Sequence, residues 1–289
     1  MLSLHTNSAT LAAERSLDRT QQNLSQSQTR LSTGYRINSA ADDAAGAQIA
    51  ARLNAQNHGG AVALRNIQNS VSMLQTAEGA LQEFDNIQRR MKDLAIQARD
   101  ASTTVNDKAA LNTEFNQLYE QFFQIAENTT FGGNQLMMVV NDPSHNWALG
   151  KLFSTMTFQV GAGANDTLDA NLSAQTFDAV VSMFSPMAFN WETVLMTDPS
   201  LAIGALDEGI DATAALRSGI GALVNQLDHA GNNLSTLQVN TASALGRYRD
   251  ADYATEAAAM ASAQMLQQSG TAMLKQGGDM TKLVLALVQ

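Results

Sequence analysis

Leucines recur about every seven residues at the start of the chain, on an otherwise polar background of Ser, Thr, Gln, Asn and Arg. The series consists of Leu4, Leu11, Leu17, Leu24 and Leu31. A repeat of this period forms one narrow apolar stripe along a helix, as in a coiled coil. The pattern therefore predicts an N-terminal helix, which Gly34 and Asn38 interrupt.

A second repeat of the same period lies at the other end of the chain and consists of Leu266, Met273, Met280 and Leu287. The nine residues of the two series are called the terminal seam below. The positions four residues on include Gly270 and Gly277, where the missing side chain lets two helix backbones approach closely. Each stripe has little else to bury it, so the two ends are expected to pair with each other and with further copies of the chain.

Between the ends, apolar residues three or four apart predict two long helical runs, over 64–98 and 111–125. His58-Gly59-Gly60 is interpreted as a break before the first run, and Asp107 as the N-cap of the second. A third long helix is predicted from about 201 to 245, because six of its residues lie seven apart. These are Leu206, Thr213, Ile220, Leu227, Leu234 and Thr241. The charged stretch 247–253 then interrupts the pattern.

Residues 132–200 differ from the rest of the chain because they hold all three prolines and both tryptophans, Trp147 and Trp191. The segment 155–160 alternates polar and apolar residues and runs into Gly161-Ala162-Gly163, which predicts a strand followed by a turn. One or two β-hairpins are expected here, with little further regularity.

Composition supports a mainly α fold and excludes several classes of function. Charged residues make up 15% of the 289 residues, aromatics 6%, and there are only three prolines and no cysteine. The formal net charge of −10 argues against a nucleic-acid partner, which needs a basic face. No secretory signal is expected at the N-terminus, and the apolar C-terminal run is too short to span a membrane.

No catalytic, cofactor-binding or metal-binding residues are predicted, and no cofactor is expected. The four histidines (His5, His58, His145 and His229) lie far apart and lack the spacing of metal ligands. Asp42 and Asp43 point about 100° apart on a helix, so they cannot serve one substrate together. Contact with basic groups, including Arg36, at a subunit boundary is the expected role of the two aspartates.

Five strings resemble bacterial flagellin. They are NLSQSQTRLSTGYRINSAADDAAGAQIA (23–50), QTAEGAL (75–81), DLAIQ (93–97), FQVGA (158–162) and RDADYATEAAAMASAQMLQQSGTAML (249–274). The resemblance covers about 1–135 and 200–289, and strings of this length in this order are specific. The tail GGDMTKLVLALVQ departs from it, because it lacks the proline usual before the final apolar residues.

The resemblance implies a mainly α fold, in which long antiparallel helices from both chain ends form two regions. Residues 1–40 and 250–289 would be the terminal helices of an inner tube with coiled-coil-like packing. Residues 41–135 and 200–249 would form a helical rod domain. Residues 136–199 would be a short variable insert with a β-hairpin.

The resemblance also implies a non-enzymatic subunit that polymerises into the flagellar filament for motility. Its implied partners are itself, the flagellar type III export apparatus with an export chaperone, and the filament cap and junction proteins. The chain would be secreted and extracellular. In members sensed by the flagellin-sensing Toll-like receptor, an Arg, a Leu and a Glu contact the receptor, and Arg90, Leu94 and Glu114 match those positions. Packing between subunits is the alternative role of these three residues.

Other functions stay open at this point. A hook–filament junction protein shares similar terminal helices. A surface ligand-binding or adhesion protein could use Trp147 and Trp191 in the insert. An enzyme grafted into the insert is disfavoured, because these 65 or so residues contain no His–carboxylate cluster.

Overall fold

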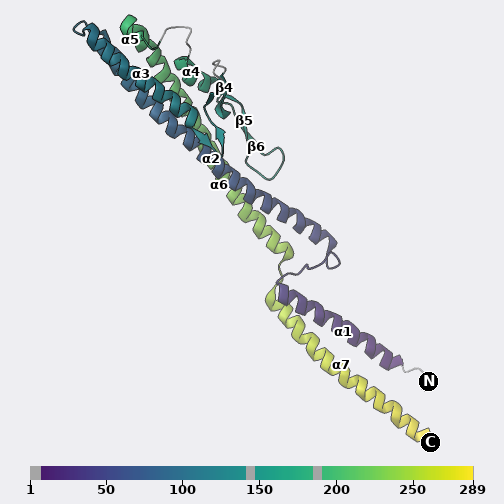
Figure 1. The fold of residues 1–289 in the computed structure, drawn as a ribbon. Helices are drawn as coiled ribbons and strands as arrows, with labels where there is room; N and C mark the ends of the chain where they lie inside the picture. Colours follow the sequence, from purple (N-terminus) through teal and green to yellow (C-terminus); the bar gives the residue numbers. More distant parts are fainter. Residues whose placement is uncertain (1–7, 141–146, 185–190, 289) are drawn as a thin grey trace. The chain divides into compact units, whose positions relative to one another are not determined.

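The computed structural model describes residues 8–140, 147–184 and 191–288, which are mainly helical (Figure 1). Contacts between residues divide the chain into two compact units. The terminal unit comprises Met1–Asn57 with Val239–Gln289, and the central unit comprises His58–Gln238. The expected fold class, long helices from both chain ends with a small β-hairpin insert, is confirmed.

The α-helices are α1 (Ser8–Thr33), α2 (Ala44–Arg99), α3 (Val105–Asn128), α4 (Ser173–Phe184), α5 (Val194–Thr197), α6 (Pro199–Arg249) and α7 (Tyr253–Val288). The strands are β1 (Thr130–Phe131), β2 (Asn134–Gln135), β3 (Met138–Val140), β4 (Trp147–Leu149), β5 (Met156–Gln159) and β6 (Thr167–Ala170), and a short 3₁₀ helix, η1, covers Lys151–Phe153.

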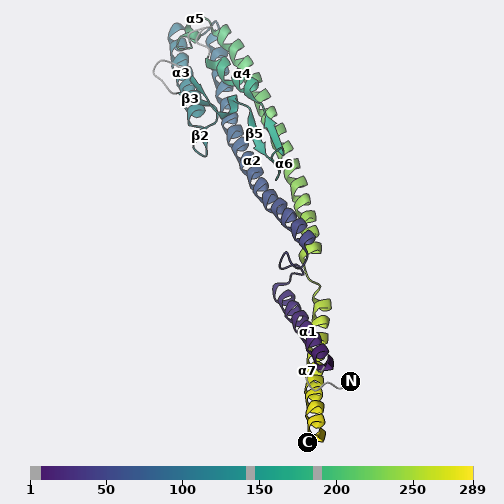
Figure 2. The same ribbon diagram turned by 90° about the vertical axis from the view of Figure 1, so that its right-hand side faces the viewer.

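In the central unit, α2, α3 and α6 lie side by side (Figure 2). Contacts between α2 and α6 show that the two helices are antiparallel, because Gln82 meets Arg217 whereas Lys92 meets Asp207. The largest buried side chains of the unit include Phe84, Phe115, Phe122, Leu74, Leu81, Met91 and Leu94. The rings of Phe84 and Phe122 stack with centroids 3.9 Å apart, joining α2 to α3.

The seven-residue series predicted in α6 forms its buried face. All six positions are buried, and the four between Leu206 and Leu227 are fully so. Thr213 is among them, and its hydroxyl donates to the side-chain oxygen of Gln88 on α2, 3.3 Å away. The prediction of a long helix with one narrow buried stripe is confirmed.

The break predicted at Gly59-Gly60 is wrong, because α2 runs through it without interruption for 56 residues, about 84 Å at 1.5 Å per residue. A Cβ on Gly59 would lie 2.8 Å from the Cβ of Ala162, in the turn of the β5–β6 hairpin. A Cβ on Gly60 would lie 3.2 Å from Gln238. The two glycines therefore make room for close neighbours within the central unit.

The start of α3 also differs from the prediction. Thr104 is the N-cap, and Asp107 is the third helical residue of a capping box. The Thr104 hydroxyl oxygen accepts from the Asp107 amide, and the Asp107 carboxylate accepts from the Thr104 amide. The hydrogen bonds from Thr104 lower the pKa of Asp107. Asp107 therefore lies in the first turn of α3, three residues after the N-cap.

The insert is more regular than expected. The described strands form three two-stranded antiparallel sheets, of which β3–β4 and β5–β6 lie in the insert and β1–β2 lies just before it. The expected hairpin is β5–β6, in which Met156 pairs with Ala170 and Gln159 with Thr167. The helices α4, η1 and α5 were not expected. Buried Thr176 of α4 donates to the carbonyl of Leu152 in η1, which ties these two short elements together.

Candidate assembly surface of the terminal helices

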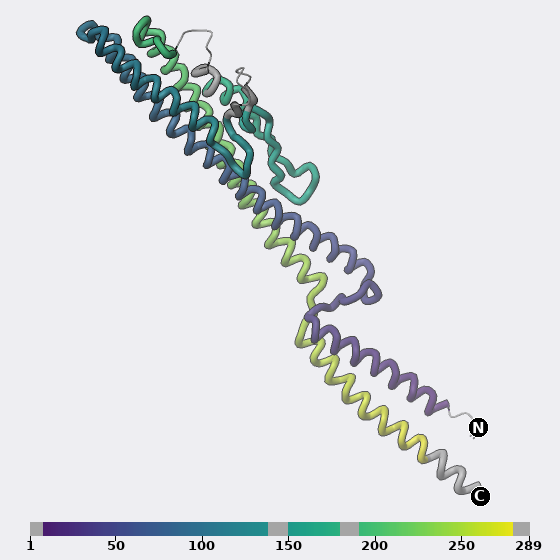
Figure 3. Tube along the Cα trace, in the orientation of Figure 1, coloured from purple at the N-terminus to yellow at the C-terminus, as the bar shows by residue number. Residues whose placement is uncertain are grey.

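In the terminal unit, α1 and α7 pack along each other as an antiparallel pair (Figure 3). A Cβ on Gly270 would lie 3.2 Å from Leu17 Cδ1, and a Cβ on Gly277 would lie 3.6 Å from the Thr10 hydroxyl oxygen. The side chain of Gln267 donates to that of Gln21. The glycines therefore let the two backbones approach closely, as their spacing suggests.

Burial between the two helices is thin. Among their described residues, the buried ones are Leu24 and Ser27 on α1 and Ala263 on α7. Leu17 and Leu31 are half-buried, whereas Leu11 is exposed. Isolated helices depend on packing of an apolar face, so the pair has little internal support.

The two described side chains in the C-terminal part of the terminal seam, Leu266 and Met273, are largely exposed. Leu266 is 62% exposed and Met273 is 66% exposed, and their neighbour Met265 is 64% exposed. Within one chain, contact with the N-terminal leucines therefore covers at most a minor part of these two side chains, and their role in an assembly seam stays a prediction. A helix turns about 100° per residue, so Leu266 and Met273 lie about 20° apart on one flank of α7, about 40° to 80° from Ala263 and Gly270. Met265 lies about 80° to 100° further round the helix, on the side opposite to Ala263. We call Met265, Leu266 and Met273 the lateral stripe.

Three seam positions cannot be placed in this way. Leu4 lies outside the described residues. Met280 and Leu287 fall within α7, but their side chains also lie outside the described part of the structure. Their roles in the terminal seam stay predictions.

A backbone clamp ties the α1–α2 linker to the break between α6 and α7. The Ala251 amide donates to the Gly34 carbonyl at 2.9 Å, and the Arg36 amide donates to the Arg249 carbonyl at 2.7 Å. Gly34 has a φ of 75°, which favours glycine and ends α1. The guanidinium of Arg249 lies 4.0 Å from the centre of the Tyr35 ring. Both predicted helix interruptions are confirmed, and they meet at one place.

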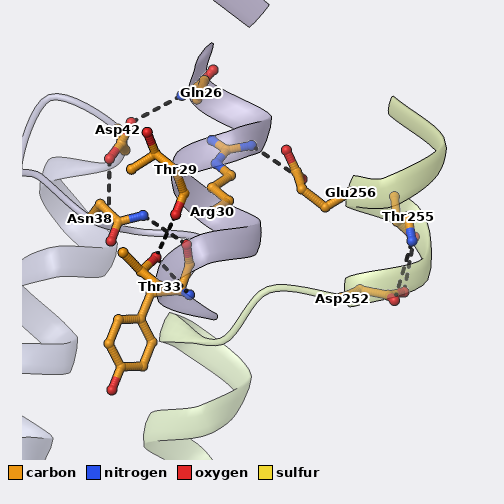
Figure 4. Close-up of polar contacts among 10 residues, drawn as sticks. Gln26, Thr29, Arg30, Thr33, Asn38, Asp42, Asp252, Thr255 and Glu256 are labelled. Atoms are coloured by element: carbon orange, nitrogen blue, oxygen red, sulfur yellow. Dashed lines mark hydrogen bonds and ion pairs between the residues drawn. The ribbon is translucent and has the colours of Figure 1, made fainter. Parts of the chain in front are cut away.

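Beside the clamp, the Asp42 carboxylate organises the linker (Figure 4). It accepts from the amides of Ser39 and Asn38, at 2.9 and 3.1 Å, and from the Gln26 side chain of α1. The hydrogen bonds of Ser39 and Asn38 are the main cause of a lowered pKa of Asp42. Within the chain, Arg36 donates to the Tyr248 carbonyl. The contact of the two aspartates with basic groups across a subunit boundary stays a prediction.

The start of α7 uses the same kind of bond on the other side of the clamp (Figure 4). The Asp252 carboxylate accepts from the Thr255 hydroxyl and from the amides of Ala254 and Thr255. These bonds lower the pKa of Asp252. Glu256 then pairs with Arg30 of α1 at 3.7 Å.

An open hollow of about 550 Å³ lies along the C-terminal half of α1. It is lined by Gln22, Asn23, Ser25, Gln26, Thr29, Arg30, Asn38, Ser39 and Asp42.

The residues matched to receptor contacts lie in the central unit, and they do not form one surface. Arg90 of α2 and Glu114 of α3 are exposed and form an ion pair. Leu94 is 1% exposed and belongs to the core. This corrects the expected trio, because the Leu94 side chain is not available beside the other two. The repeat over 64–98 already includes Leu94, so its burial could have been inferred.

One of the two tryptophans on which the adhesion alternative depends, Trp191, is buried. Trp191 is 4% exposed and stacks on the rings of Phe115 and Tyr119, each with centroids 5.8 Å away. Burial, with Glu120 and Glu192 nearby, raises the pKa of Tyr119 to about 12. The Trp147 side chain lies outside the described residues. Trp191 therefore stabilises the central unit from inside and offers no surface to a ligand.

The described residues hold no group of three His, Cys, Asp or Glu side chains close enough to bind a metal ion. None of the described helices is both long and apolar enough to cross a membrane. The fold and its surfaces are those of a helical structural protein. Its two terminal helices bury few side chains on each other, and the lateral stripe stays exposed.

Comparisons with known proteins identify the family. Residues 4–142 match the bacterial flagellin N-terminal helical region, and residues 203–288 match the bacterial flagellin C-terminal helical region. The chain belongs to the bacterial flagellin family. Flagellins are structural proteins and not enzymes, and this chain is a structural subunit of the flagellar filament.

Relatives match along nearly the whole chain. A flagellin of Halalkalibacterium halodurans is 35% identical over 92% of this chain and 93% of its own length. Flagellin A of Vibrio anguillarum is 27% identical over the full length of both.

Two solved structures are also similar. A Bacillus cereus flagellin is 28% identical with a TM-score of 0.47, covering 63% of this chain and 94% of that one. A putative flagellar hook-associated protein from Vibrio parahaemolyticus has a TM-score of 0.59 at 17% identity, covering 72% of this chain and 100% of that one. The second likeness is one of fold alone, so it does not favour the junction alternative.

Proposed function

We propose that polymerisation buries the lateral stripe against a second copy of the chain. The single observation that carries this proposal is the large exposure of Leu266 and Met273 on a helix that places Gly270 and Gly277 against α1. Exposed apolar stripes of this kind mark interaction surfaces. Membership of a family of filament subunits makes a second copy the expected occupant.

A matched pair of charge substitutions tests this proposal. Leu266→Glu places a carboxylate on the lateral stripe, whereas Gln268→Glu places the same charge on an exposed position of α7 that the stripe does not include. We expect Leu266→Glu to prevent sedimentable filaments and Gln268→Glu to form them at near wild-type concentrations. Equal behaviour of the two variants would refute the role of the stripe.

The three regions of the filament subunit are part of the same proposal. Residues 1–40 and 250–289 would line the inner tube, residues 41–135 and 200–249 would form the rod, and residues 136–199 would be the outer insert. The clamp between Gly34 and Ala251 supports the inner boundary, because both helix breaks meet there.

The terminal helices are proposed to become ordered only on assembly. Fixing a residue costs about 1–2 kcal/mol of backbone entropy, and the α1–α7 pair buries few side chains to offset it. Amide exchange at Leu11 and Leu266 should therefore be fast in the monomer and slow in the filament. Strong protection of either amide in the monomer would contradict this part of the proposal.

The finer partners are proposals that rest on the family. Secretion through the flagellar type III export apparatus, with a cytoplasmic chaperone for the C-terminal segment, fits a terminal unit that is thinly packed. Addition of subunits beneath a filament cap, next to junction proteins, fits the same unit. Recognition by the flagellin-sensing Toll-like receptor is proposed through Arg90 and Glu114 alone, since Leu94 is buried.

A further inference from the structure

We propose that Met265 and Met273 are oxidation sites, and that their conversion to methionine sulfoxide blocks polymerisation of the chain. The inference rests on the proposed assembly role of the lateral stripe. It adds a chemical modification, and with it a form of regulation, to that surface.

The structure separates the methionines by access to solvent. Met265 and Met273 are 64% and 66% exposed, so a dissolved oxidant reaches their sulfur atoms. Met91 and Met137 are fully buried in the central unit, and Met156 is nearly so. Oxidation follows exposure, so the two stripe residues should react well before these three.

The reaction needs only a peroxide. The thioether sulfur attacks one oxygen of hydrogen peroxide, the O–O bond breaks, and that oxygen bonds to sulfur. The sulfur loses two electrons and the peroxide gains them. The second oxygen leaves as water after proton transfer. The product is a polar sulfoxide on a side chain that was apolar, and methionine sulfoxide reductases reverse the change.

The consequence differs between the free chain and the polymer. In the free chain the sulfoxides stay in water, because both side chains are largely exposed. In the polymer the same side chains would be buried beside Leu266, where the sulfoxide oxygen would lose its hydrogen bonds to water. Oxidised subunits should therefore keep their fold but be incorporated poorly into filaments.

Met196 provides an internal control. It lies in α5 of the central unit and is 39% exposed. Its sulfur should also react with peroxide, but its sulfoxide lies outside the lateral stripe. Oxidation at Met196 should therefore have no effect on incorporation into filaments.

The experiment uses the full chain, treated with hydrogen peroxide until each molecule carries about one sulfoxide. The mixture is polymerised and sedimented, and peptide mass spectrometry measures the sulfoxide fraction at each methionine in pellet and supernatant. We expect sulfoxide at Met265 and at Met273 to be about tenfold depleted in the pellet, equivalent to about 1.4 kcal/mol. Sulfoxide at Met196 should be equally represented in both fractions.

A variant carrying Met265→Leu and Met273→Leu keeps the apolar volume without the sulfur. It should still polymerise after a peroxide dose that stops the wild type, and Met196→Leu should give no such resistance. Sulfoxides at 265 and 273 that enter the pellet freely would overturn the inference and leave the proposed function standing. Failure of the untreated chain to polymerise would overturn both.

Discussion

The close approach of Gly270 to Leu17 makes the pairing of the terminal helices testable. A Cβ at position 270 would already lie 3.2 Å from Leu17 Cδ1, which is tighter than an ordinary contact. Gly270→Leu adds three further carbons in the same direction. The larger side chain should therefore force α1 and α7 apart, unless space is made for it on α1.

Overpacking of this kind costs about 1–3 kcal/mol. If the pair is ordered on assembly, the cost appears in the free energy of adding each subunit. Since 1.4 kcal/mol is a factor of ten, the critical concentration for polymerisation should rise about 5-fold to 140-fold. Leu17→Ala removes the group that clashes, so the double variant should recover about 1–2 kcal/mol of coupling energy relative to the sum of the singles.

The assay is sedimentation of filaments over a concentration series for the wild type, the two single variants and the double variant. Gly278→Leu is the control, because a Cβ at 278 has no atom within 4 Å. We expect the double variant to polymerise at about a tenth of the concentration that additive effects would require. Strict additivity would show that Gly270 and Leu17 are not in contact in the filament.

Three further outcomes follow from the structure. Phe84→Ala removes a ring stacked on Phe122 and should lower the free energy of unfolding in urea by about 3–5 kcal/mol. The backbone hydrogen bonds from Ser39 and Asn38 hold the pKa of Asp42 below its usual range, so its stabilisation is present above about pH 4 and lost as pH falls through the folded pKa. Asp42→Asn should therefore reduce the acid sensitivity of the terminal unit in a circular-dichroism pH titration of assembled filaments. Arg90→Ala with Glu114→Ala should abolish receptor activation in a reporter-cell assay, and unchanged activation would refute that role.

Most of the helical framework is predictable from period alone. The repeats ending at Leu31 and starting at Leu206 correspond to α1 and to the buried face of α6. Local glycine content was misleading at Gly59-Gly60, where a cost of about 1 kcal/mol per glycine is outweighed by contacts with Ala162 and Gln238. Only the folded arrangement shows what those glycines accommodate.

The candidate site was harder to predict than the fold. Large apolar residues indicate where a helix carries apolar surface, but they do not say which neighbour covers it. On α7 the side that contacts α1 carries Ala263 and Gly270, and the missing side chain of Gly270 lets the two backbones come close. Leu266 and Met273, which the same period marks, are left for another partner. Trp191 follows no period in the insert, so its place in the core could not be inferred.

A cryo-EM map of filaments grown from the purified chain tests the central claim most directly. In that map, α1 and α7 of each subunit should form an antiparallel pair, with Leu266 and Met273 buried against a neighbouring copy. A map in which these two side chains face solvent would contradict it.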